Sequence, residues 1–169
     1  NDFQSVTAAI NLYQDRYRAL PGDDAGAAVR WAAPVATVAG DGDGVFDGAY
    51  NTVCGPAVAD EACLFWQHLR LAGLVGGATA DRTQAVNATQ GRTGVQNGGL
   101  GLVGPVICSN NLPAKIAQAI DAQFDDGDTR TGTVRGAIIA NLNDPLPAAV
   151  PGANYVDNGV NIYVVCKAP

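Results

Sequence analysis

Two clusters of aspartate place carboxylate oxygens, the ligands that calcium prefers in proteins, at short spacing along the chain. The first cluster contains Asp41, Asp43 and Asp47, within the segment Gly-Asp-Gly-Asp-Gly-Val-Phe-Asp-Gly. Its spacing is similar to the start of a calcium-binding loop, but Val45 and Thr52 stand where further oxygen ligands are needed. We therefore favour a solvated Asp-Gly turn that holds no calcium tightly, with a calcium site as the alternative.

The second cluster consists of Asp125, Asp126 and Asp128, which surround a glycine in the segment Asp-Asp-Gly-Asp. These residues also offer hard oxygen ligands, although a turn at the end of a helix is again the simpler interpretation. They are the next candidates for calcium after the first cluster. The sequence indicates no other cofactor.

Nucleophilic catalysis has little support in the sequence. The only serines are Ser5 and Ser109, and neither stands in a Gly-x-Ser-x-Gly pattern. The single histidine, His68, falls inside a predicted helix and is interpreted as a residue near the edge of the core. No glycine-rich motif that cradles phosphate is present. We expect that the protein is not an enzyme.

Residues 87–89 have the form of an N-glycosylation site.

Four cysteines, without a Cys-x-x-Cys pair, favour two structural disulfides over catalytic or metal-binding thiols. Such bridges indicate an oxidising compartment: the periplasm, the cell surface or the medium. Four cysteines allow three pairings. Because only eight residues separate Cys54 from Cys63, a local bridge forms easily there, and Cys108 is then left to pair with Cys166.

The composition indicates one loop-rich globular domain spanning residues 1–169. Hydrophobic residues make up 47% of the chain, enough for a sizeable core, whereas charged residues make up only 15%. The formal net charge of −6 argues against a nucleic-acid partner or an anionic membrane surface. No apolar run is long enough to span a bilayer.

The strongest periodicity predicts a helix over residues 1–20. Its apolar side chains recur at steps of three and four, at Phe3, Val6, Ile10, Tyr13, Tyr17 and Leu20. Pro21 and Gly22 end this helix. An abrupt start at the first residue is typical of the lower half of a longer helix. We expect its end near Asn1 to be partly exposed and its other end to cover a sheet.

The remaining pattern predicts an α+β fold of short elements. Helices are expected over residues 60–74 and 113–124, the latter with an apolar stripe at Ile116, Ile120 and Phe124. Strands are expected over residues 100–108, 133–140 and 160–166, and an exposed loop over residues 76–99. The expected architecture is a long N-terminal helix packed on a small antiparallel sheet, with loop-rich insertions.

Four segments, in this order, resemble the type IV pilin and pseudopilin family. The first runs from Tyr13 to Asp24 and includes Leu-Pro-Gly-Asp after a tyrosine-rich helix end. The second is the Gly/Asp-rich stretch 40–48, and the third is the helix with an acidic start at 61–74. The fourth is the helix-to-sheet junction at 120–132. Together they cover about residues 1–75 and 114–136, and the other stretches look specific to this chain.

The resemblance implies a pilin-like fold and a structural subunit of an extracellular pilus or pseudopilus, without an active site. It implies a stem upstream of Asn1 that anchors in the inner membrane, with the globular part in the periplasm before assembly. The partners would be other pilin subunits, contacted through the assembly helix at Phe3, Val6, Ile10 and Tyr13. The alternative is a small secreted calcium-dependent binding protein or hydrolase.

Overall fold

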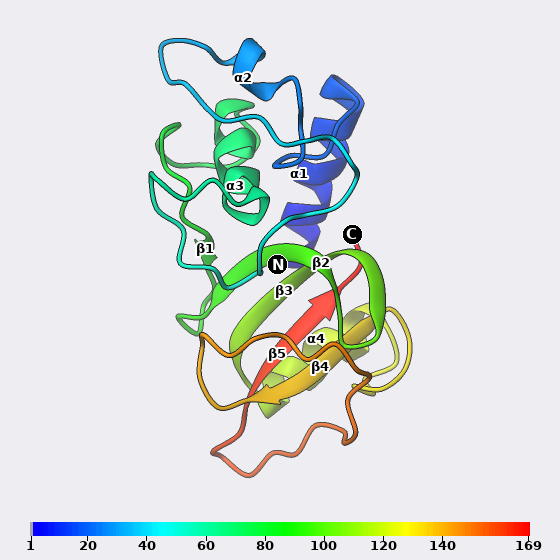
Figure 1. The fold of residues 1–169 in the computed structure, drawn as a ribbon. Coiled ribbons are helices and arrows are strands. Elements are labelled where there is room, and N and C mark those ends of the chain that lie inside the picture. Colours follow the sequence, from blue (N-terminus) through cyan, green and yellow to red (C-terminus); the bar gives the residue numbers. More distant parts are fainter. Residues whose placement is uncertain (1) are drawn as a thin grey trace. The chain divides into compact units, whose positions relative to one another are not determined.

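A computed structural model describes residues 2–169, and their contacts form two compact units. The helical unit consists of the residues up to Gly48 and of Thr52–Gln84, and the sheet unit consists of Ala49–Asn51 and Ala85–Pro169. The helical unit contains α1 (Asp2–Tyr17), α2 (Ala27–Arg30) and α3 (Glu61–Leu71) (Figure 1). The sheet unit contains α4 (Ala114–Phe124) and the strands β1 (Ala85–Val86), β2 (Arg92–Gly99), β3 (Leu102–Pro113), β4 (Val134–Ile139) and β5 (Ile162–Lys167). No helix within residues 2–169 is long and apolar enough to cross a membrane.

Helix α1 forms because its apolar side chains share one face, which is buried at Phe3, Val6, Ala9, Ile10 and Tyr13. The helix ends after Tyr17, where Arg18 takes up a left-handed conformation with φ of 57°. Phe3 is only 2% exposed, whereas Leu20 is half-buried. The expected exposure near the start of the chain is therefore wrong.

Helix α3 is buried on all sides, from Glu61 to Arg70. A helix with no solvent face has to satisfy its polar side chains inside the protein, which His68, Gln67 and Arg70 do. The Cys54–Cys63 disulfide ties the preceding segment to this helix. Both disulfides present, this one and Cys108–Cys166, are the predicted pairs, so the predicted pairing is confirmed.

The sheet has five antiparallel strands in the order β1-β2-β3-β5-β4. Cys108 and Cys166 stand directly opposite each other on β3 and β5, and their disulfide belongs to a core cluster with Tyr50, Val106 and Val164. The three predicted strands are present. The predicted loop over residues 76–99 is wrong at Ala85–Val86, which form β1, and at Arg92–Gly99, which form β2.

Close packing explains why residue 94 of β2 is a glycine. A Cβ atom at Gly94 would lie only 2.0 Å from the backbone oxygen of Tyr50, so no side chain fits where these two segments meet. Because small and polar residues are poor signals for a strand, this stretch has the composition of a loop.

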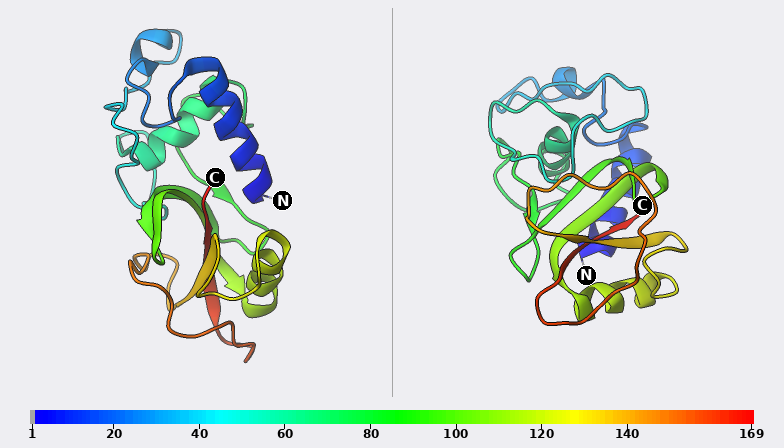
Figure 2. Two further views of the ribbon diagram at one scale, coloured as in Figure 1. Left: turned by 90° about the vertical axis from the view of Figure 1, so that its right-hand side faces the viewer. Right: turned by 60° about the horizontal axis from the view of Figure 1, so that its bottom comes forward.

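The predicted packing of a long N-terminal helix on the sheet is also wrong, although the α+β class and the antiparallel sheet are present. Helix α1 has 16 residues and belongs to the helical unit. The helix that lies against β3, β4 and β5 is α4 (Figure 2). Its inner face carries Ala114, Ala117 and Asp121. Small alanines allow close approach to the sheet, and Ile116 of the predicted apolar stripe is 43% exposed.

We expect the Cys108–Cys166 bridge to stabilise the protein more than the Cys54–Cys63 bridge. The bridges close loops with sequence separations of 58 and 9, and in the chain-entropy model these are worth about 4 and about 3 kcal/mol. Urea unfolding of the two double Cys→Ser variants tests this. A larger loss of unfolding free energy in the Cys54→Ser/Cys63→Ser variant would contradict it.

Candidate functional site

The carboxylate of Asp23, in the turn after α1, accepts three backbone N–H groups of one loop. One oxygen accepts the backbone N–H groups of Gly42 and Asp43, at 2.6 and 3.1 Å, and the other accepts that of Gly44 at 2.8 Å. Asp23 is 3% exposed. Burial raises its pKa, against the opposing effect of the three N–H donors. The side chain thus acts as an anchor for the Gly/Asp-rich loop.

Glu61, the first residue of α3, holds the same loop from the other side. Its Oε1 accepts the backbone N–H of Asp41 at 3.1 Å, and its Oε2 accepts that of Asp47 at 3.0 Å. Burial raises the pKa of Glu61 as well. A Cβ atom at Gly22 would lie 2.5 Å from the backbone oxygen of Glu61, so the turn after α1 and the start of α3 are in close contact.

His68 joins this turn to α3 with both ring nitrogens. Its Nδ1 accepts the N–H of Gly22 at 2.9 Å, so its Nε2 carries the proton and donates to the oxygen of Val38 at 3.0 Å. Burial lowers the pKa of His68 to about 4, and the ring is neutral at physiological pH. With both nitrogens in use, the ring offers no free base to a substrate.

Asp24 is the centre of a second polar cluster. Its carboxylate accepts the hydroxyl of Tyr13 at 2.6 Å, the N–H of Gly26 at 2.8 Å and Nη1 of Arg30 at 2.5 Å. Burial alone would raise the pKa of Asp24, but these donors together lower it below its usual range. The Arg30 guanidinium also lies 4.2 Å from the ring centre of Tyr17, within cation–π distance.

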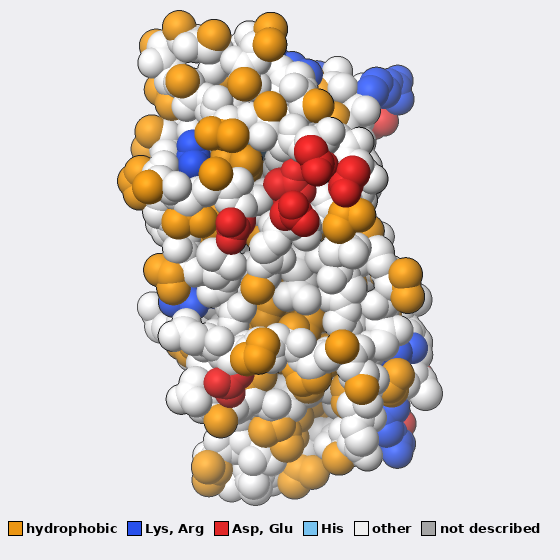
Figure 3. All heavy atoms as spheres, in the orientation of Figure 1, with side chains coloured by type: hydrophobic (Ala, Val, Ile, Leu, Met, Phe, Trp, Pro, Cys, Tyr) orange, Lys and Arg blue, Asp and Glu red, His pale blue; other side chains and the backbone are white. Residues whose placement is uncertain are grey.

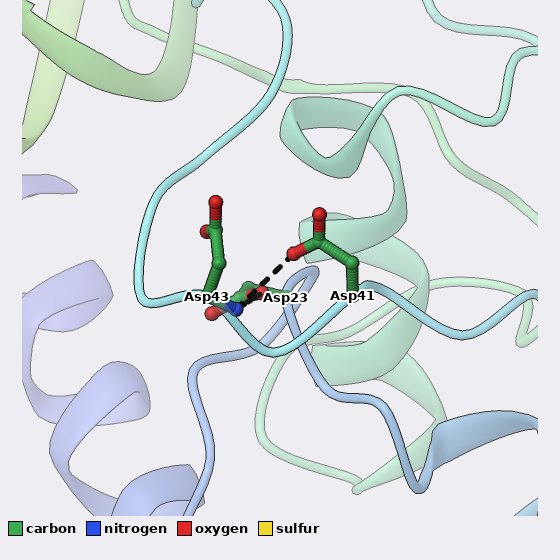
Figure 4. Close-up of side chains that lie close together, drawn as sticks. All are labelled: Asp23, Asp41 and Asp43. Carbon is green, nitrogen blue, oxygen red and sulfur yellow. Dashed lines mark hydrogen bonds between the residues drawn. The ribbon is translucent and has the colours of Figure 1, made fainter.

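The predicted calcium ligands divide between separate roles. Among the described residues, one group of three carboxylates has its oxygens within 4.8 Å, and it joins Asp41 and Asp43 to Asp23 rather than to Asp47 (Figure 4). In that group Asp41 accepts the N–H of Asp43, and Asp43 accepts that of Val45. All three carboxylates are therefore already acceptors for backbone N–H groups of the loop itself.

The second aspartate cluster does not converge on a common point within the described residues. Asp125 accepts the N–H groups of Thr133 and Val134, and Asp126 accepts the hydroxyl of Thr131. Asp128 is paired with the guanidinium of Arg130, which lowers the pKa of that carboxyl to about 2. These contacts organise the turn between α4 and β4.

The glycosylation-like segment lies inside the sheet unit. Asn87 is 6% exposed, and its Nδ2 donates to the Ser109 hydroxyl and to the Asn110 carbonyl, both at 2.8 Å. Its Oδ1 accepts from Thr89 and Gly91. The nitrogen to which a glycan would be attached is thus buried and bonded.

Sequence reasoning missed the anchoring roles of Asp23 and Glu61. In the sequence, Glu61 marks only the acidic start of the predicted helix. A signal was available for Asp23, because an aspartate in a turn commonly accepts backbone N–H groups.

Comparison of the chain with protein-family models, with curated proteins and with solved structures finds no match in any of the three.

Replacing Asp23 by Ala should destabilise the protein by about 1–3 kcal/mol, because three N–H groups lose their acceptor at once. Asp43→Ala is the matched control. It removes a carboxylate from an exposed position where only one N–H is bonded, and should cost less than about 1 kcal/mol. Urea unfolding measures both. Equal losses would show that Asp23 is not the anchor.

The buried His68 should make stability depend on pH. Its pKa is lowered in the folded state from 6.5 to about 4, so its contribution is fully present above pH 6.5 and is lost as the pH falls towards 4. The loss is about 3 kcal/mol. A His68→Gln variant lacks this titration. The raised pKa values of Asp23 and Glu61 favour the folded state at low pH in both proteins and cancel in the comparison. Parallel curves of unfolding free energy against pH would contradict the prediction.

Proposed function

We propose that the chain is a structural subunit of an extracellular filament of the type IV pilus or pseudopilus kind, and that it performs no catalysis. The proposal rests on the segments that carry the family resemblance. It does not rest on the packing of a long helix against the sheet, which was wrong.

The observation that supports it most is that three of those segments are bonded to one another in the helical unit. The turn after α1 donates from Gly22 to His68 of α3 and accepts through Asp23 from loop 40–48. The same loop donates to Glu61 of α3. Residues distant in sequence thus form one hydrogen-bonded cluster, which gives a physical reason for the segments to occur together.

The use of the polar groups in this cluster favours a structural role over catalysis. Both nitrogens of His68 and the carboxylates of Asp23 and Glu61 are bonded to backbone groups. A catalytic acid or base needs an atom within reach of a substrate, whereas these atoms fix the ends of two helices and a loop. Such an arrangement suits a rigid head that stands at the surface of a polymer.

The two disulfides indicate an oxidising environment, extracellular or periplasmic. We propose that the chain is held at the inner membrane before assembly, and that the assembled filament at the cell surface is its final location. The proposed partners are other pilin subunits, as copies of this chain or as a mixture.

Immunogold labelling of surface filaments tests the proposal, in cells that produce the chain from its natural gene and in a deletion strain. Label along the filaments, and its loss on deletion, are expected. Recovery of the chain only as a free secreted protein, with filaments unchanged in the deletion strain, would overturn the proposal. Codons upstream of Asn1 that encode no apolar segment would also count against it.

A further inference from the structure

An open cleft of about 670 Å³ lies in the helical unit where α1 ends. Its walls come from the last turn of α1, the turn 23–26, Arg30 of α2 and two glycines of the acidic loop 41–47, Gly42 and Gly44. All of these belong to the helical unit, so the cleft is formed by one compact body.

The cleft offers positive charge to a partner. The carboxylates of Asp23 and Asp24 lie in its wall but are buried and already bonded. Arg18 is exposed and forms no ion pair with any of residues 2–169. Arg30 is paired with Asp24 through Nη1 alone, and its side chain is 29% exposed. The groups free to bind are therefore guanidinium donors, which favour carboxylates.

The rim of the same cleft carries the opposite charge. Gly42 and Gly44 line the cleft, and they flank Asp43. Asp41, Asp43 and Asp47 are exposed, and none forms an ion pair with a cation of the described chain. Figure 3 shows carboxylates gathered on one face of the helical unit. Unpaired charges of both signs thus stand next to each other.

We infer that this surface pairs with the same surface of a second copy of the chain, the acidic loop 41–47 of each copy entering the cleft at Arg18 and Arg30 of the other. A two-fold axis brings two adjacent patches of opposite sign together twice, so that each copy both gives and receives one contact. A partner of a single sign, such as a nucleic acid or a basic peptide, would meet like charge in one half of the surface. The choice of a second copy as the partner rests on the proposed function. Because a two-fold contact closes on itself, this pairing adds to the contacts that build a filament and does not replace them.

Sedimentation velocity of the full chain tests the pairing through charge reversal. Arg18→Glu and Asp43→Lys should each weaken self-association at least tenfold, a loss of about 1.4 kcal/mol. Lys115→Glu and Asp157→Lys are the matched controls, because they make the same charge changes in the exposed pair of the sheet unit and should leave self-association unchanged. These controls matter because the net charge of −6 makes copies repel each other in general.

The decisive experiment mixes the Arg18→Glu and Asp43→Lys variants. Arg18→Glu copies keep an acidic loop and gain an acidic cleft, whereas Asp43→Lys copies keep a basic cleft and gain a basic loop position. Each alone should stay monomeric, and the equimolar mixture should associate as the wild type does. A wild type that stays monomeric, controls that lose association equally, or a mixture that does not associate would each overturn the inference.

Two further measurements keep the outcome clear. If Asp43→Lys melts early because the N–H of Val45 loses its acceptor, Asp47→Lys replaces it, since Asp47 is another exposed carboxylate of the same loop. Immunogold labelling of cells that carry Arg18→Glu separates the two proposals. Labelled filaments together with a monomeric wild type would leave the filament function standing and remove this surface. Association in solution without labelled filaments would do the reverse.

Discussion

The helical unit depends on the buried carboxylate of Asp23, which accepts backbone N–H groups from a loop distant in the sequence. Asp23 is 3% exposed and receives three N–H groups from consecutive residues of a glycine-rich loop. A glycine-rich segment loses much conformational entropy when it becomes ordered. The Asp23 and Glu61 carboxylates offset that cost from two sides, and the buried ring of Phe46, which packs against Phe65 of α3, adds an apolar anchor.

The need to bond backbone groups of irregular segments also explains why the interior of this unit contains so many polar side chains. His68 and Arg70 of the buried helix α3 form hydrogen bonds with backbone groups of irregular segments. Those segments have no regular secondary structure that would pair these groups. The N–H of the buried Gly22, for example, would have no acceptor without His68. Polar residues in this core therefore replace the secondary structure that the loops lack.

The sequence predicted features that are local and missed those that depend on distant contacts. The periodic stripe of α1, the helix beginning at Glu61 and the strand ending at Cys166 were recognised because neighbouring residues determine them. Strand β2 was missed because its glycine at position 94 serves a contact with Tyr50, which no local pattern reveals. In α4 the predicted apolar stripe is only partly buried, with Ile116 exposed, because small alanines form the face closest to the sheet. For the site, spacing indicated Asp41 and Asp43 correctly as neighbours but could not reveal that Asp23 joins them.

The disulfide between β3 and β5 also determines how the protein would respond to tension. Cys108 and Cys166 are opposite residues of adjacent strands, and their bond closes a loop with a sequence separation of 58. A force applied to the two ends of the chain would pass through this bond, so that α4, β4 and the intervening segments carry no load. About 200 Å of extended chain is thereby withheld from stretching. Pulled from its ends, the protein would yield in the residues before Cys108 and keep the rest of its sheet unit short.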